Sequence, residues 1–179
     1  MGAMGSFNFF ITKNFKEMEV FIHSNRGFES KKVTVQPHQK VGLLIKEHFP
    51  VLAHQKDFLE DVEIYLANKK DDLDKGLSFQ DAGICGGDHL FIGRCKSVSV
   101  TVTYAGKDIC LTVPPSLRIR RLQKQVLEQL NIDPDDGIDL LLWLNADEPL
   151  GNRILIGSTT DYPDCSVLLM LASKKDING

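Results

Sequence analysis

The chain has 179 residues, of which 42% are hydrophobic and 25% are charged, and its formal net charge at pH 7 is -3. These are ordinary values for a globular protein, and the slightly acidic balance excludes a broad basic surface for nucleic acid. No apolar run approaches the roughly 20 residues of a membrane span, and no charged-then-apolar leader precedes a cleavage site. We therefore expect a cytoplasmic protein that binds neither nucleic acid nor membrane.

The N-terminal segment lies outside the pattern that dominates the rest of the chain. Residues 1–6, MGAMGS, are typical of a cloning remnant and are left out of fold reasoning. Residues 7–15 form an apolar arm that either packs on the first domain or docks on the sheet edge of another subunit and drives self-association. The large apolar side chains of this arm are Phe7, Phe9, Phe10 and Ile11.

From residue 16 onward, one order of elements occurs twice. Each copy contains a strand, a turn, a second strand, a helix, a third strand, a loop-rich stretch and a last apolar strand. A repeat of this length indicates tandem domains, since solenoid repeats are much shorter. The pattern predicts a first domain at residues 16–93, a linker at 94–97, a second domain at 98–171 and a flexible tail at 172–179.

Hydrophobic periodicity separates the helices from the strands. Apolar residues recur three and four apart between Val41 and Phe49 and again between Ile119 and Leu130, which predicts one amphipathic helix in each domain. Strict alternation, as in the run Val98 to Tyr104, predicts strands.

No residue cluster carries recognisable catalytic or metal chemistry. The five histidines are scattered, and no nucleophile, base and orienting group occur in a known arrangement. The four cysteines lack CxxC spacing and lie among strand-like segments, which favours buried reduced thiols over a zinc site or a disulfide framework. We predict no cofactor, no metal and no enzymatic activity. The cysteines are Cys85, Cys95, Cys110 and Cys165.

Two runs resemble ubiquitin. The run TYAGKDICLTVPPSLRIRRLQKQVLEQLNIDPDD, Thr103 to Asp136, resembles its hairpin and helix, including the turn glycine and lysine and the Ile-x-Pro-Asp exit. The run LDKGLSFQDAGICGGDHLFI, Leu73 to Ile92, resembles its closing segment. The chain is thus similar to a tandem ubiquitin-like protein. The resemblance implies an α+β fold of two β-grasp domains, each a mixed sheet wrapped around one helix.

The tandem members of this family include the interferon-stimulated modifier of vertebrates and its bacterial counterparts in antiphage operons. In these modifiers the C-terminal glycine is adenylated, passed to enzyme cysteines as a thioester and joined to a target amine. The resemblance therefore implies conjugation through Gly179. It also implies an E1-like activating enzyme, an E2-like conjugating enzyme, a metal-dependent deconjugating isopeptidase and a target protein such as a phage structural protein.

The tail departs from the usual ending of the family, which is Gly-Gly after arginines. This departure implies a different activating enzyme and favours the bacterial relatives. The tail residues that such an enzyme would recognise are Lys174, Lys175, Asp176, Ile177 and Asn178.

An exposed patch would complete the resemblance. Alternate side chains of a strand face opposite sides of a sheet, so at least one of Leu142 and Trp143 should point away from the helix. We favour an exposed partner-binding patch over burial because an aromatic residue among apolar neighbours is a typical binding anchor. The patch comprises Tyr104, Leu142, Trp143 and Leu168.

The sequence is compatible with three functions. The leading one is a protein modifier that is conjugated through Gly179, in bacterial antiviral defence. The second is a tandem ubiquitin-like adaptor that is never conjugated. The third is a regulatory pair of domains that belongs to a longer enzyme.

Overall fold

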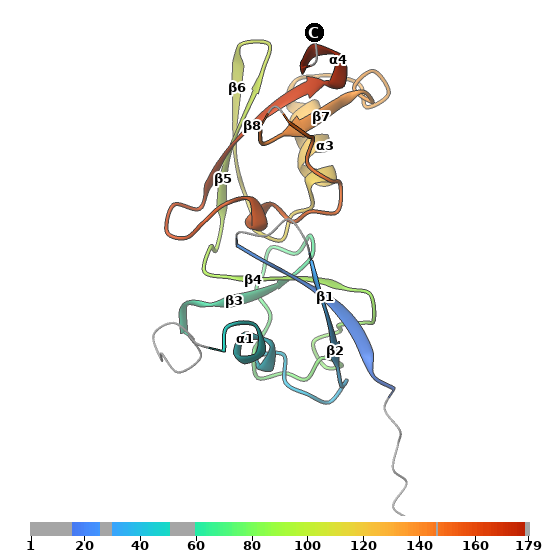
Figure 1. Ribbon diagram of the computed structural model, residues 1–179, viewed down its shortest axis with the longest axis vertical. Helices are drawn as coiled ribbons and strands as arrows, with labels where there is room; N and C mark the ends of the chain where they lie inside the picture. The colour runs from blue at the N-terminus through green and yellow to red at the C-terminus, as the bar shows by residue number, and fades with distance from the viewer. Residues whose placement is uncertain (1–15, 26–29, 51–59, 146, 178–179) are drawn as a thin grey trace, which may run out of the picture.

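The computed structural model describes residues 16–25, 30–50, 60–145 and 147–177. Within these residues the chain forms two four-stranded sheets, and Figure 1 shows the two domains following one another along the long axis of the molecule. The first domain contains β1 (Met18–Ser24), β2 (Lys31–Val35), α1 (Leu43–His48), β3 (Glu63–Leu66) and β4 (His89–Gly93). The second contains β5 (Val98–Tyr104), β6 (Lys107–Val113), α3 (Ile119–Gln129), β7 (Leu140–Trp143), the 3-10 helix η1 (Ile156–Thr159), β8 (Ser166–Ser173) and α4 (Lys174–Ile177).

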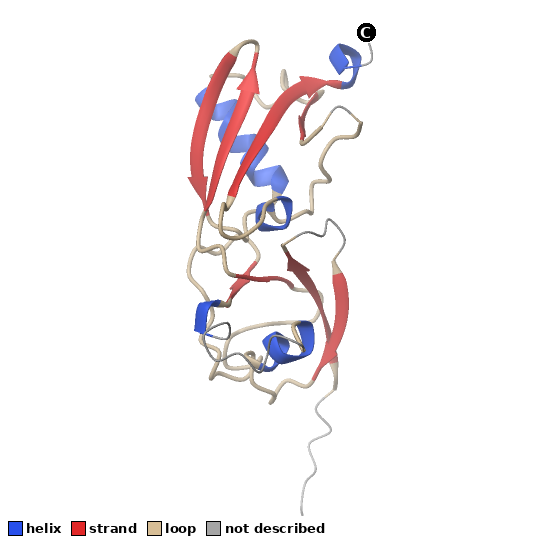
Figure 2. Cartoon of the chain, turned by 60° about the vertical axis from the view of Figure 1, so that its left-hand side comes forward, coloured by secondary structure: helices blue, strands red, loops and turns tan. Residues whose placement is uncertain are grey.

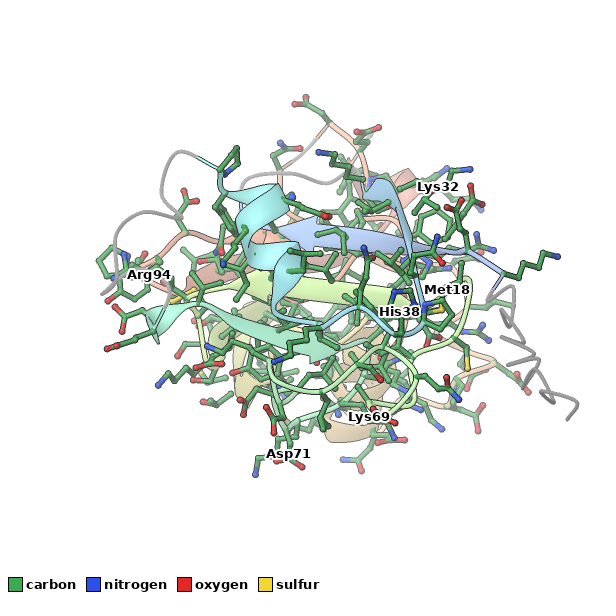
Figure 3. The ribbon with its side chains drawn as sticks, turned by 90° about the horizontal axis from the view of Figure 1, so that it is seen from below. Met18, Lys32, His38, Lys69, Asp71 and Arg94 are labelled. Atoms are coloured by element: carbon green, nitrogen blue, oxygen red, sulfur yellow. A yellow bond between two sulfur atoms is a disulfide. The ribbon has the colours of Figure 1, made fainter. Side chains whose placement is uncertain are left out.

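The two sheets have the same topology, with strand orders β2-β1-β4-β3 and β6-β5-β8-β7. In each sheet the two central strands run parallel, and each outer strand is antiparallel to its neighbour. Figure 2 shows α3 behind the second sheet, and Figure 3 shows α1 across one face of the first. The chain therefore consists of two tandem ubiquitin-like β-grasp domains of the α+β class, as the resemblance implies.

Alternating side chains build the core of each domain between its sheet and its helix. In β5, Val98, Val100 and Val102 are buried, whereas the intervening Ser99 and Thr103 are exposed. This pattern is expected for a strand with one face on the core and the other face toward solvent. The first core draws on β1, β4 and α1 in the same way, with Val20, Ile22, Leu44, Ile45, Leu90 and Ile92.

The two domains pack on each other through the face of the first sheet that lies opposite α1. Phe91 of β4 and Leu155, next to η1, are fully buried and form a third apolar cluster with Tyr65. The contact is close at Gly157, where an added Cβ would lie 2.5 Å from Cε2 of Phe91. Only a glycine leaves room for the Phe91 ring at this point.

Hydrogen bonds join the domains on both sides of this cluster. The Asn25 side chain donates to the carbonyl oxygen of Thr160 at 2.8 Å. The Asn68 backbone N–H donates to the carbonyl oxygen of Ser116 at 2.8 Å, and the Asn68 side-chain oxygen accepts the Arg118 backbone N–H at 3.1 Å. Polar groups of one domain thus form hydrogen bonds with backbone groups of the other, and these bonds restrict rotation of the domains about the short linker.

The linker itself is anchored at Arg94, which Figure 3 labels at the opposite side of the first domain from Met18 and Lys32. The Arg94 guanidinium lies 3.8 Å from the centre of the Tyr162 ring and contacts the Asp61 carboxylate at 2.8 Å. The side chain therefore connects the linker to a loop of the second domain and to the start of β3.

The prediction of four buried reduced thiols is wrong. Cys95 in the linker forms a disulfide with Cys165, which precedes β8, and the two residues are 70 positions apart in the sequence. The other two, Cys85 and Cys110, are free and exposed. Because β5 and β8 are parallel neighbours, their N-terminal ends meet, and this meeting brings the two bonded cysteines together.

The last strand runs two residues beyond the predicted end of the second domain at residue 171, because β8 extends to Ser173. The apolar arm at residues 7–15, with Phe7, Phe9, Phe10 and Ile11, lies outside the described residues, as do Asn178 and Gly179. Within the described ranges, the helices are too short or too polar to cross a membrane.

Candidate functional site

The two sheets use their outer faces differently, although their topologies are equal. The outer face of the first sheet carries Tyr65 and Phe91 and is covered by the second domain. The outer face of the second sheet carries Leu168 and Met170 on β8, which are 74% and 38% exposed. We call the latter surface the open face. It is the candidate recognition surface of the described chain.

The register of the strands defines the open face. Leu168 is paired with Thr101 and Met170 with Thr103 across the parallel β5–β8 ladder. Thr101 is in turn paired with Cys110 of β6, and the two side chains approach to 3.8 Å. Two apolar side chains therefore stand beside short polar ones on an otherwise flat surface.

The predicted patch is wrong for two of its four members. Leu142 points toward α3 and belongs to the core, with 1% of its surface exposed. Trp143 points to the opposite side, in register with Met170, but only 3% of its surface is exposed. Its indole N–H donates to the carbonyl oxygen of Ala172 at 3.0 Å. The Trp143 side chain thus faces away from the helix, but its ring is not exposed because the indole packs against the sheet.

The other two members have different positions. Leu168 is exposed as expected, whereas Tyr104 is half-buried against the core of the second domain. The sequence analysis missed Met170. Alternation along β8, in which Val167, Leu169 and Leu171 are buried, would have placed Met170 on the same face as Leu168.

The tail starts as a helical turn and not as an extended strand. The Ser173 hydroxyl donates to the Asp176 carboxylate at 2.6 Å, and the Asp176 backbone N–H donates back to the Ser173 hydroxyl oxygen at 3.2 Å. The hydrogen bonds that the Ser173 hydroxyl and the Ser173 backbone N–H donate to the Asp176 carboxylate lower the pKa of Asp176. Lys174, Lys175 and Asp176 are exposed, and Ile177 is half-buried. Figure 1 shows α4 at the end of the molecule that lies farthest from the first domain.

Two histidines meet on the covered face of the first sheet. Nε2 of His23 lies 2.8 Å from Nδ1 of His89, and the Phe21 ring stacks on His89 at 4.7 Å. Burial, together with the smaller effects of the neighbouring His89 and Arg118, lowers the pKa of His23 from its ordinary value of 6.5 to about 4. His23 is therefore neutral in the folded protein at pH 7.

The pKa of His23 predicts a loss of stability in acid. The unfolded chain takes up a proton at this residue near pH 6.5, whereas the folded chain does so only near pH 4. The free energy of unfolding should therefore fall by about 3 kcal/mol as the pH is lowered through these two values, with no further loss from His23 well below pH 4. Urea unfolding of His23→Gln should show a shallower pH dependence than the wild type. His38→Gln, at an exposed histidine, is the control, and equal slopes for wild type and His23→Gln would contradict the prediction.

Comparison with known proteins gives a family match over the second domain. Residues 99–174 match the family model described as BilA ubiquitin-like domain 2. Solved structures with a similar chain include Caldiarchaeum subterraneum ubiquitin, at 15% identity and a TM-score of 0.37, over 45% of this chain and 95% of that one. They also include a chain of the pParkin-pUb-UbcH7 complex, at 21% identity and a TM-score of 0.36, over 47% of this chain and 25% of that one. No curated protein matches the chain.

Proposed function

We propose that this chain is a ubiquitin-like protein modifier, activated at Gly179 and conjugated to amino groups of target proteins in bacterial antiviral defence. The observation that carries the proposal is the match of residues 99–174 to a BilA ubiquitin-like domain, since the match runs from β5 into the tail. Glycine suits the reacting position because it has no side chain to block a narrow enzyme channel.

The position of the tail supports the proposal. The tail leaves β8 at the end of the molecule opposite the first domain, so an activating enzyme can approach it without contacting that domain (Figure 1). The turn held by Ser173 and Asp176 would open to let the tail extend. The six residues from 174 to 179 then reach roughly 20 Å, compared with about 9 Å as a helix.

The open face supplies a second contact for the enzyme. Leu168 and Met170 lie on the same strand that leads into the tail, six and four residues before Lys174, where α4 begins. An enzyme that binds this face holds the tail at a fixed distance from its own reactive centre. We therefore propose the open face and residues 174–178 together as the recognition surface for an E1-like and an E2-like enzyme, and for a metal-dependent isopeptidase that reverses the reaction.

Thioester formation tests the proposal. Incubation with the cognate activating enzyme and ATP should yield an enzyme-linked species that disappears on reduction. Gly179→Arg should abolish it, because the side chain blocks the approach of the terminal carboxylate. Gly151→Arg is the matched control, since Gly151 is exposed in a loop and an added Cβ there meets the Ile154 side chain only at an ordinary contact distance of 3.5 Å. An active enzyme that forms no thioester with the intact chain, or an equal yield with Gly179→Arg, would refute the modifier function.

The exposed Leu168 also favours a second candidate, an adaptor that binds partners and is never conjugated. Leu168→Asp separates the two. An adaptor would lose its partner with this variant and would be indifferent to Gly179→Arg, whereas a modifier would depend on Gly179 above all.

A further inference from the structure

A cavity of about 500 Å³ lies between the two domains, away from the open face and the tail. Its walls come from four separate places in the chain. His23 of β1 and His89 of β4 line it from the first domain, and Arg118 and Arg153 line it from the second. The volume is typical of sites that hold small molecules.

Two polar atoms in the side chains that line this cavity lack partners in the described part of the chain. His23 has 3% of its surface exposed, and its Nδ1 atom has no hydrogen-bond partner there. The Nε atom of Arg118 is also buried without a described partner. Buried polar atoms in folded proteins are nearly always paired, so two such atoms in one cavity call for an explanation.

The electrostatics of the cavity are positive. Arg118 and Arg153 both lower the pKa of His89, after burial, which is the largest cause. Asp88 is the one carboxylate that acts on His89 in the opposite direction. Its Oδ2 atom already accepts the backbone N–H of Cys85 at 2.8 Å, within its own turn. Two permanent cations and two imidazoles thus line the cavity, and the carboxylate beside His89 is engaged in its own turn.

We propose that this cavity binds a phosphate group, either as inorganic phosphate or as the phosphate monoester of a small molecule. A phosphate dianion matches the two guanidinium charges, and its oxygens accept hydrogen bonds from several directions at once. The imidazole of His89, whose Nδ1 atom is engaged with His23, can donate from Nε2 toward it. Because the donors come from both domains, a bound phosphate links them and stabilises the arrangement of the two domains.

The test is a titration of the full chain, followed through the imidazole signals of His23 and His89 by NMR. Inorganic phosphate and adenosine monophosphate are the two probes. We expect saturable shifts of both histidines with at least one probe. Equal affinities assign the site to the phosphate group alone, and tighter binding of the nucleotide assigns it to a phosphate monoester. The absence of a saturable shift with both probes would overturn the proposal without bearing on conjugation at Gly179.

Arginine variants establish that the cavity is the site. Arg118→Gln should weaken binding about tenfold or more, because its guanidinium is partly buried in the cavity wall. Arg153→Gln should weaken it about threefold, since Arg153 is exposed at the rim. Arg121→Gln, on the exposed side of α3, is the charge-matched control and should leave the affinity unchanged. An equal loss in all three variants would mean non-specific attraction and would refute the site.

Discussion

Replacement of Phe91 by alanine is expected to lower the free energy of unfolding by about 3–5 kcal/mol, the usual cost of truncating a fully buried phenylalanine. Phe91 contributes no contact to the helix-facing core, since it belongs to the cluster between the domains. The loss should therefore also uncouple the domains. Trp143 is the single tryptophan and reports on the second domain, whereas circular dichroism reports on both. The two probes should give coincident urea transitions in the wild type and separate ones in Phe91→Ala.

A second variant tests the same interface by crowding it. Gly157→Ala places a methyl group 2.5 Å from the Phe91 ring, and overpacking of this kind costs about 1–3 kcal/mol. Gly151→Ala is its control, because the nearest atom to an added Cβ there is 3.5 Å away. Coincident transitions in Phe91→Ala, together with equal stabilities of the two glycine variants, would show that the interface contributes little.

Loss of the disulfide should lower the free energy of unfolding by an amount similar to that expected for Phe91→Ala. A bond that closes a loop of 70 residues restricts the unfolded chain by about 4 kcal/mol in the chain-entropy treatment. Cys95→Ser should therefore unfold at a lower urea concentration than the wild type, and a reductant should shift the wild type by the same amount. Cys110→Ser removes an exposed free thiol and should change the stability by less than about 0.5 kcal/mol. A wild type that is equally stable with and without reductant would contradict the prediction.

The fold could be predicted because its signals are local. Alternation in β5 and helical spacing in α3 depend on residues within one element, and each domain repeats them. The interface could not be predicted in the same way, although one signal was present. Leu90, Phe91 and Ile92 are consecutive and buried, and such a run indicates a strand covered on both faces.

The candidate sites depend on contacts between distant residues, which the sequence does not reveal. Cys95 and Cys165 meet because two strands run parallel, and His23 and His89 meet for the same reason in the other domain. Trp143 shows a different limit. Alternation places its side chain on the outer side of the sheet, but it does not reveal that the indole is buried there and hydrogen-bonds to the carbonyl oxygen of Ala172.

The covered first sheet also fixes the valency of the molecule. Two copies of one fold suggest two equivalent docking surfaces and the avidity that comes with them. Here the outer face of the first sheet holds the two copies together, so a receptor that recognised the open face would meet one such face per chain. A receptor that required both faces would first have to separate the domains, and its apparent affinity would fall by the fraction of molecules found in that open state. For such receptors the duplication would give a monovalent ligand of twice the length.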